Sequence, residues 1–268
     1  MKPSLLFATA SLVALTSIGC TAAVDTGEAS GETSNAIVNG LPIAGDDFGP
    51  VRIVSILGLR CSGALVTSQW VLTAKHCFID ADVSSPGTVV VNTASQKTPA
   101  DKIVLHGTLD IAMVHMPNPI TTTIPPSSLY TLDPSTLTGK SLECFGYGDS
   151  KLAPGGGTTG DGALREWIFP VKDASMAYAM TLASDGVHFA ADGDSGGPCY
   201  LTEFGLTTHV GVMIRATSAE TVLVPSSAIS AFVAVTIIKG VTPPAPLDFS
   251  GWTISPIAGT FGDRFGLR

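Results

Sequence analysis

The sequence predicts an all-β protein of the barrel or sandwich type, with one helix near its C-terminal end. From Ile37 onward, short runs of strand-forming residues alternate with clusters of Gly, Pro, Ser and Thr. Such a pattern is typical of many short antiparallel strands. The runs are VRIVSIL, WVLTA, TVVVN, KIVLH, DIAMVHM and HVGVMI. Residues 225–240, PSSAISAFVAVTIIKG, begin with Pro and end with Gly, which favours a helix.

The first part of the chain, residues 1–20, resembles an export signal. Lys2 precedes the apolar stretch Leu5–Gly19, which is too short and too rich in Ser and Thr for a membrane span. Its end, TSIGC, resembles a bacterial lipoprotein signal in which Cys20 receives the lipid, although Ser17 stands where such signals usually have Leu. The alternative is plain secretion with cleavage near residues 20–23. We therefore expect an exported protein, either secreted or anchored to a membrane by a lipid on Cys20.

Three further segments organise the rest of the chain. Residues 21–36 are small, polar and acidic without periodicity, which indicates a linker or pro-segment. The Pro- and Thr-rich stretch Met116–Gly139 divides the strand-rich region into two nearly equal halves. After the predicted helix, residues 241–268 show no pattern that indicates a structure or a role.

Charge and cysteine content narrow the function classes. The net charge of −8 argues against a nucleic-acid partner, because phosphate binding depends on clustered Lys and Arg. Export places the five cysteines in an oxidising compartment, where they pair. If Cys20 carries a lipid, the other four allow three pairings. The five histidines show no metal-ligand spacing, so we expect neither a metal nor a cofactor.

Three residues in the chain could carry nucleophilic chemistry. Ser195 lies in the Gly-rich segment GDSGGP, and serine catalysis needs a base, a group that orients the base, and N–H donors for the oxyanion. His76 in the segment TAKHC and Asp110 at the head of an apolar run supply the other two groups in the order His, Asp, Ser. We interpret the other histidines as surface residues or as residues whose hydrogen bonds are satisfied within the fold; they are His106, His115, His188 and His209. We expect Asp80, Asp82 and Asp101 in solvated loops.

These motifs resemble the trypsin/chymotrypsin family of serine peptidases. The sequence carries IVNG for the mature N-terminus of that family, TAKHC for its TAAHC, and DIAMV for its DIALL. GDSGGP is unaltered, and CFGYG corresponds to a cysteine followed by GWG. The matches run in the family's order from Ile37 to about Lys239.

The resemblance implies two six-stranded antiparallel β-barrels, at about residues 37–125 and 126–240, with a C-terminal helix. The triad of His76, Asp110 and Ser195 would lie in the cleft between them. His76 would act as general base and then as general acid, and Asp110 would fix its tautomer. The backbone N–H groups of Gly193 and Ser195 would form the oxyanion hole.

The resemblance also implies two disulfides. Cys61 and Cys77 match the family's bridge beside the catalytic histidine. Cys144 and Cys199 have each moved two positions from the family's usual places, one forward and one backward along the chain. Opposite moves of two residues preserve the register and the face of an antiparallel ladder, so we expect a shifted bridge.

Activation and specificity are the remaining expectations from the resemblance. Asp194 would pair with the α-amino group of Ile37 after cleavage. Asn35 and Ala36 precede that site, so the activating protease is unknown and is not trypsin-like. Residues around the serine indicate an apolar first pocket that disfavours Lys and Arg, although Arg215 could attract acidic groups. The pocket residues are Phe189, Ala190, Ile214, Arg215 and Ala216.

Protein or peptide would then be the substrate. One alternative is a catalytically weak, peptidase-like binding protein, and a weaker one is an esterase with the same triad.

Overall fold

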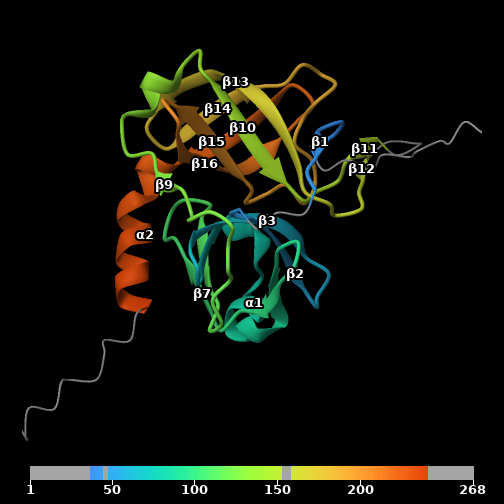
Figure 1. The fold of residues 1–268 in the computed structure, drawn as a ribbon, viewed down its shortest axis with the longest axis vertical. Helices are drawn as coiled ribbons and strands as arrows, with labels where there is room; N and C mark the ends of the chain where they lie inside the picture. Colours follow the sequence, from blue (N-terminus) through green and yellow to red (C-terminus); the bar gives the residue numbers. More distant parts are fainter. Residues whose placement is uncertain (1–36, 45–47, 153–157, 241–268) are drawn as a thin grey trace, which may run out of the picture. The chain divides into compact units, whose positions relative to one another are not determined.

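The computed structural model describes residues 37–44, 48–152 and 158–240 (Figure 1). All of them belong to one unit of the chain. The predicted export signal with Cys20, the predicted linker and the C-terminal tail lie outside the described residues.

A closed barrel forms the second half of the fold. Its strands follow the order β13-β10-β15-β16-β17-β14, and an additional pairing between β13 and β14 closes the ring. Neighbouring strands around this ring are antiparallel. The strands are β10 Ser141–Gly146, β13 Arg165–Met176, β14 Ala179–Ala183, β15 Pro198–Glu203, β16 Leu206–Ala216 and β17 Glu220–Pro225.

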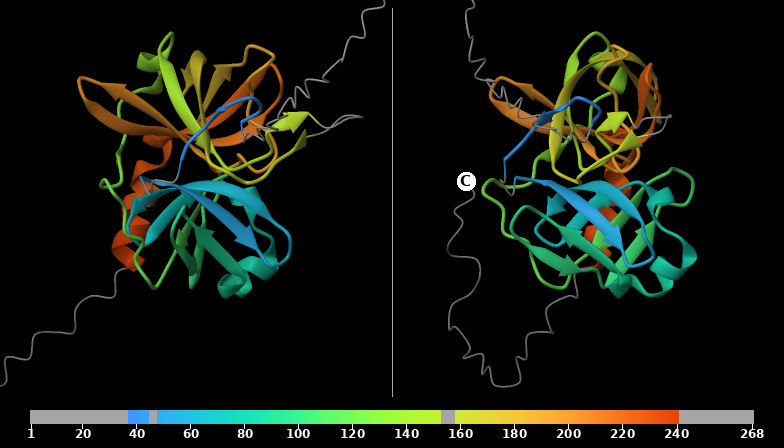
Figure 2. Two further views of the ribbon diagram at one scale, coloured as in Figure 1. Left: turned by 45° about the vertical axis from the view of Figure 1, so that its right-hand side comes forward. Right: turned by 90° about the vertical axis from the view of Figure 1, so that its right-hand side faces the viewer.

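A curled antiparallel sheet forms the first half, in the order β6-β5-β2-β3-β4-β8-β7. Figure 2 shows the two strand systems as separate bodies, one blue to green and one yellow to orange. Within the described residues, no pairing joins the edge strands β6 and β7, so this half is an open barrel. Its sheet has seven strands, one more than the six that the family resemblance implies. The strands are β2 Pro50–Ser55, β3 Arg60–Thr67, β4 Trp70–Thr73, β5 Val89–Asn92, β6 Lys97–Pro99, β7 Lys102–Leu105 and β8 Ala112–His115.

Alternating side chains give each half its own core. In β2, Val51 and Ile53 are buried while Arg52 and Val54 face outward, as expected for a strand with one covered face. Val51 and Ile53 pack with Val91 and Val114 in the first half. The second half has a separate core of apolar side chains. All six runs predicted as strands form strands, and the predicted all-β fold class is confirmed.

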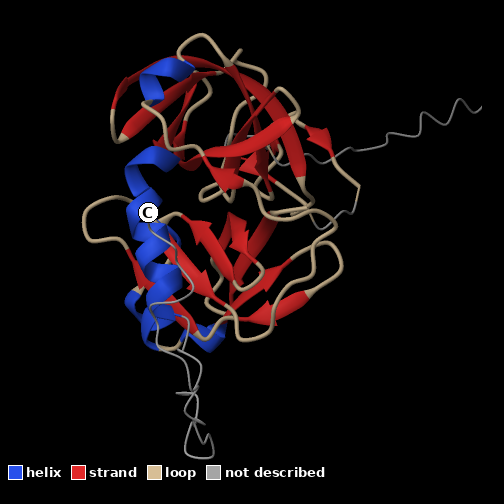
Figure 3. Ribbon diagram, turned by 60° about the vertical axis from the view of Figure 1, so that its left-hand side comes forward, coloured by secondary structure: helices blue, strands red, loops and turns tan. Residues whose placement is uncertain are grey.

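The helix α2, Ser226–Gly240, lies along both halves (Figures 1 and 3). Its buried residues Ile229 and Val233 share a core with Trp70 and Met113 of the first half and Val212 of the second. This third core explains the apolar residues on one face of the helix, whereas Val235 and Ile238 are exposed. The helix predicted at residues 225–240 is confirmed. No helix within the described ranges is both long and apolar enough to cross a membrane.

The remaining elements are short. The segment β1, Leu41–Pro42, pairs with β13, so the described chain begins on the second barrel rather than on the first. The others are η1 Lys75–Cys77, α1 Asp80–Ser84, η2 Pro86–Thr88, β9 Ser128–Leu129, η3 Pro134–Leu137, β11 Lys151–Leu152 and β12 Thr158–Thr159.

One aspartate expected in solvent is buried instead. The carboxylate of Asp82 accepts hydrogen bonds from Ser55 Oγ at 2.6 Å and from the N–H of Ile79 at 3.2 Å. The expectation was wrong because Asp82 lies in the first turn of α1, where a carboxylate can satisfy free N–H groups.

Candidate active site

Antiparallel pairing brings His76 and Asp110 together. Thr73 at the end of β4 lies opposite Ala112 at the start of β8. The chain that leaves β4 therefore emerges beside the chain that enters β8. His76 lies in the 3₁₀ turn η1 just after β4, and Asp110 lies just before β8. The two residues are 34 positions apart in the sequence, and this pairing of β4 with β8 brings them together.

Two hydrogen bonds join this pair. Asp110 Oδ2 lies 2.6 Å from His76 Nδ1, and Asp110 Oδ1 accepts the backbone N–H of His76 at 2.8 Å. The hydrogen bond to Asp110 raises the pKa of the His76 imidazole, although partial burial opposes it. Burial acts to raise the pKa of Asp110, but the bonds from His76 outweigh it and hold that pKa below its usual value. The imidazole is thus oriented by Nδ1, which leaves Nε2 as the nitrogen available for chemistry.

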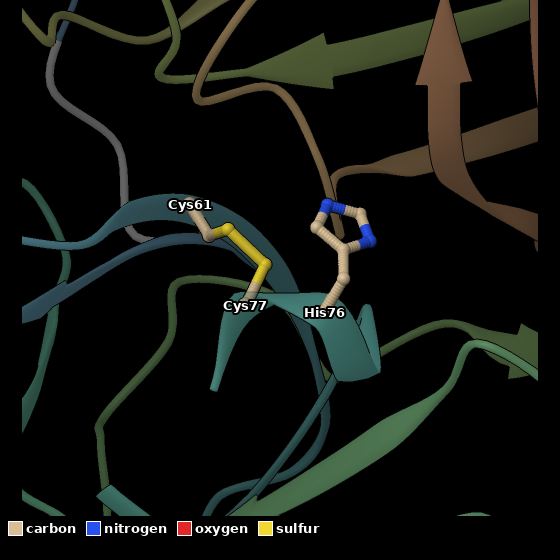
Figure 4. Close-up of side chains that lie close together, drawn as sticks. All are labelled: Cys61, His76 and Cys77. Carbon is tan, nitrogen blue, oxygen red and sulfur yellow. A yellow bond between two sulfur atoms is a disulfide. The ribbon is translucent and has the colours of Figure 1, made fainter. Parts of the chain in front are cut away.

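Ser195 lies against the first half of the fold through its backbone. Its carbonyl oxygen accepts the N–H of Ser62 at 2.8 Å and lies 3.8 Å from Cys77 Sγ. Figure 4 shows the imidazole of His76, the residue before Cys77, standing beside the Cys61–Cys77 bridge. The loop that carries Ser195 is therefore held beside the turn that carries His76. In the described chain, no hydrogen bond joins Ser195 Oγ to His76, a bond that often tightens only with substrate present.

The backbone around Ser195 leaves two N–H groups unused. Asp194, Gly196 and Gly197 donate their N–H groups to carbonyl oxygens. Across the described residues, the N–H groups of Gly193 and Ser195 donate no hydrogen bond. Gly193 has φ of 94°, and a Cβ added there would lie 2.7 Å from Gly148 Cα. A glycine is thus required at the turn just before Ser195.

Asp194 is buried beside the serine and accepts three backbone N–H groups. Ala191 and Gly148 donate at 2.8 and 2.9 Å, and Ile37 donates at 3.2 Å. Burial raises the pKa of this carboxyl group to about 7, although these three bonds act to lower it. Ile37 is fully buried, and its φ of 49° is rare for a β-branched residue. The described segment that leads to β1 therefore begins inside the site, at Ile37, and not on the surface.

Two disulfides hold the strands around this site. Cys61 is bonded to Cys77, and Cys144 is bonded to Cys199. Cys144 and Cys199 are direct partners in the β10–β15 ladder, as the opposite two-residue moves imply. Ligand atoms of Cys61, His76 and Cys77 lie within 4.8 Å of one another. The two sulfurs are bonded to each other and are not thiolates, so this group does not offer a metal three ligands.

A small cavity opens beside Ser195. Its volume is about 20 Å³, close to the space that one water molecule needs. Three of the predicted pocket residues, Ala190, Arg215 and Ala216, line it together with Ser195. Phe189 and Ile214 do not line it. Phe189 pairs with Val38 through the backbone, and Ile214 packs against the first and third cores.

Ser62 is the residue of this site that sequence reasoning missed. It is buried, its hydroxyl donates to Gly193 O at 2.8 Å, and it accepts the N–H of Tyr147 at 2.8 Å. One side chain thus connects the first half to the turn before Ser195. The available signal was a serine within the apolar run CSGALV, because a buried hydroxyl in a strand needs partners.

The closed barrel, the curled partner sheet and the paired His76 and Asp110 beside Ser195 define the class of two-barrel peptidase folds. The chain belongs to the trypsin family: the sequence model of the family described as Trypsin matches residues 37–229.

Two bacterial proteins are also similar to this chain. One is an uncharacterized peptidase of Corynebacterium glutamicum strain R, 25% identical over 174 residues, which are 63% of this chain and 60% of that protein. A protein named as a peptidase, from another strain of the species, is 24% identical over the same shares of the two chains. The chain thus spans less than two thirds of the length of these relatives.

Proposed function

We propose that this chain is an exported serine endopeptidase that uses His76, Asp110 and Ser195 and forms an acyl-enzyme. The observation that carries the proposal is the His76–Asp110 pair, which is joined by two hydrogen bonds. This pair lies beside the loop of Ser195, in which the N–H groups of Gly193 and Ser195 donate no hydrogen bond within the described residues. Membership of the trypsin family and the peptidase names of the relatives support the same reaction class.

In this mechanism, His76 Nε2 removes the proton from Ser195 Oγ as that oxygen attacks the peptide carbonyl carbon. The proton then passes from Nε2 to the leaving amine, and the carbon–nitrogen bond breaks. Water repeats the sequence on the acyl-enzyme and restores Ser195. Asp110 keeps Nδ1 protonated and stabilises the imidazolium. The N–H groups of Gly193 and Ser195 bind the oxyanion, a contribution of about 10²–10³ in rate for one donor.

The small cavity beside Ser195 supports specificity for small apolar side chains. A space of about 20 Å³ lined by Ala190 and Ala216 accommodates a methyl group but not a Lys, Arg or aromatic side chain. We therefore propose that the residue before the cleaved bond is Ala, Gly or Ser. Arg215 lies exposed at the rim of the same cavity, where a long substrate side chain would meet it.

Activation follows from the position of Ile37. We propose that an unknown protease cuts between Ala36 and Ile37, and that the new α-amino group pairs with Asp194. If Cys20 carries a lipid, the same cut releases the domain from its anchor. Export agrees with the two disulfides, since such bonds persist in oxidising compartments.

Labelling with a fluorophosphonate tests the catalytic assignment. The protein is prepared with Ile37 as its first residue, labelled, digested and analysed by mass spectrometry, with Ser195→Ala and His76→Ala as controls. An adduct on Ser195 that both controls lack supports the peptidase. The alternative is a peptidase-like binding protein, consistent with the missing hydrogen bond between Ser195 Oγ and His76. An unlabelled Ser195 in folded protein that begins at Ile37 would reject the peptidase and favour that alternative.

A further inference from the structure

A second cavity lies on the outer face of the first sheet. Its volume is about 510 Å³, and it is bounded by β2, by the turn between β5 and β6, and by residues 162–164 near the second barrel. Its walls include the apolar side chains of Ile43, Val54 and Leu164 and the ring of Tyr147. Two cations, Arg52 and Lys97, also line it. It shares no residue with the small cavity beside Ser195.

The polar residues Arg52, Asn92 and Lys97 of this cavity belong to a row of directly paired residues. Ser62 pairs with Arg52 across β3 and β2, Arg52 pairs with Asn92 of β5, and Asn92 pairs with Lys97 of β6. Residues directly opposite in a ladder share a face of the sheet. The row therefore runs along one face from Ser62, which contacts both Gly193 O and Ser195 O, to Lys97 at the sheet edge.

The two cations of this row have no acidic partner in the part of the chain that the structure describes. The chain has 22 acidic and 14 basic residues, so a basic side chain readily finds a partner. Arg52 Nε is buried without a hydrogen-bond partner, and the nearby carboxylate of Asp161 bonds Arg165 instead. A buried guanidinium donor left unpaired costs free energy that a bound anion would recover.

Gly162 positions the guanidinium of Arg52. A Cβ added to Gly162 would lie 2.6 Å from Arg52 Cζ, so the bare backbone of the 162–164 segment lies directly over the charged group. The segment holds the guanidinium at the base of the cavity and restricts its movement. The planar, multiply donating group is thus preorganised for a planar carboxylate.

We place this cavity on the leaving-group side of the proposed cleavage site, because it shares no lining residue with the small cavity beside Ser195. The small cavity beside Ser195 would take the residue before the cleaved bond, and no residue of the row that starts at Ser62 lines that cavity. Neighbouring strands are about 4.8 Å apart and an extended peptide advances about 3.3 Å per residue. Arg52 and Lys97 then lie about two to four residues beyond the cleaved bond.

We propose that this cavity binds a carboxylate of the peptide substrate, two to four residues after the cleaved bond, through Arg52 and Lys97. The inference rests on the proposed peptidase function and adds a preference for acidic peptides on the leaving-group side. The carboxylate can belong to a Glu or Asp side chain or to the peptide's own C-terminus.

Matched peptides test the proposal. Each carries Ala before the cleaved bond, and either Glu or Gln at the second to fourth positions after it, with an amidated C-terminus. A further Gln peptide ends in a free acid at the fourth position. We expect kcat/KM to be about tenfold higher for Glu than for Gln at low salt, with the difference shrinking as salt rises. A preference only for the free acid would assign the site to the C-terminal carboxylate.

Three variants locate the effect. Arg52→Gln reduces the Glu/Gln ratio to below about twofold, and Lys97→Gln, a change at an exposed side chain, reduces it partly. Lys239→Gln removes the same charge from α2 and keeps the ratio. A wild-type ratio near one for both carboxylate sources, or a ratio unchanged in Arg52→Gln and Lys97→Gln, would overturn the proposal.

Direct binding separates this proposal from the peptidase assignment. Ser195→Ala protein and fluorescently labelled Glu and Gln peptides give dissociation constants by anisotropy without turnover. We expect tighter binding of the Glu peptide, lost in the Ser195→Ala, Arg52→Gln double variant. Fluorophosphonate labelling reports on the catalytic serine independently. If Ser195 is labelled but the Glu and Gln peptides bind equally, the carboxylate site is rejected and the peptidase is kept. If Ser195 is unlabelled but the Glu peptide binds more tightly, the peptidase is rejected and the carboxylate site is kept.

Discussion

The backbone nitrogen of Ile37 lies 3.2 Å from Oδ2 of Asp194, the residue directly before the proposed nucleophile. The two residues are 157 positions apart, and both are buried. In the uncut chain this nitrogen is a neutral amide. Cleavage before Ile37 would turn it into an α-ammonium group at the same place, so the pair can report whether the chain has been cut.

The first prediction concerns stability and pH. Burial raises the pKa of Asp194 to about 7 in the folded, uncut chain, whereas the unfolded value is near 4. Between these values the folded state binds more protons than the unfolded state, so stability falls as pH rises from about 4 to 7. An α-ammonium at Ile37 favours the carboxylate and removes this loss.

Urea midpoints between pH 4 and 7.5 measure the effect. Protein that begins at Ile37 should lose less stability over this range than the longer, uncut protein. Asp194→Asn in the longer protein serves as the control and should remove the contribution of this carboxyl group. Identical pH profiles for the two wild-type forms would contradict the proposed ion pair.

The second prediction concerns Asp110→Asn. The amide cannot hold Nδ1 of His76 in the protonated form, so kcat should fall by about 10⁴ while the fold is kept. The pKa of His76 should also fall, because the bond to Asp110 raises it. The acid limb of the residual kcat/KM profile therefore moves to lower pH. Circular dichroism checks folding, and a rate near that of the wild type would refute the triad.

The third prediction concerns Gly193→Ala. It separates the effect of a positive φ from the effect of the contact between an added Cβ and Gly148. Gly193→Ala introduces a Cβ 2.7 Å from Gly148 Cα and displaces an oxyanion donor, so we expect kcat to fall about 100-fold or more. Gly205 has a similar φ of 77° but nothing within 4 Å of an added Cβ. Gly205→Ala should lower the thermal midpoint slightly and leave kcat unchanged. Equal losses of kcat in the two variants would contradict the oxyanion role.

The fourth prediction concerns His209, which is buried and bonds Ser226 at the start of α2 through Nδ1 at 2.7 Å. Burial lowers the pKa of His209 to about 4. The unfolded state binds the proton below about 6.5, so stability falls as pH drops from about 6.5 to 4, by an amount on the order of 2 kcal/mol.

The pH dependence of stability that His209 contributes has the opposite sign to that of Asp194 in the uncut chain. The His209→Gln variant is therefore needed to measure the contribution of His209. The difference between wild type and variant in urea midpoint should change across pH 4–6.5. A constant difference would show that His209 does not take up a proton on unfolding.

The fifth prediction concerns the cavity beside Ser195. In peptides that vary only before the cleaved bond, Ala should exceed Phe and Lys by about 100-fold in kcat/KM, since larger side chains require the site to deform. Ala216→Gly enlarges the cavity and should raise the rate for Val relative to Ala several-fold. Efficient cleavage after Lys or Phe by the wild type would reject this specificity.

Much of the fold could be predicted because it depends on local pattern. Runs of strand-forming residues at 51–57 and 70–74 are sufficient to predict strands, and Pro225 and Gly240 bound the helix. The Cys144–Cys199 bridge could be expected from a two-residue step, because the side-chain period of a strand is two. Asp82 was misjudged, because its burial depends on Ser55 and Ile79, which the turn of α1 brings to it.

The sequence by itself determined the strand-rich fold class, the family resemblance and the candidate residues His76, Asp110, Ser195 and Ile37. It could do so because these signals are short motifs in a recognisable order. Only the tertiary structure decided that Ser62 connects the two halves, that Ala190 and Ala216 leave a cavity of about 20 Å³, and that Arg52 lies unpaired beneath Gly162. These features arise where strands and loops that are distant in sequence pack together. Local sequence patterns do not specify which of these distant side chains will be in contact.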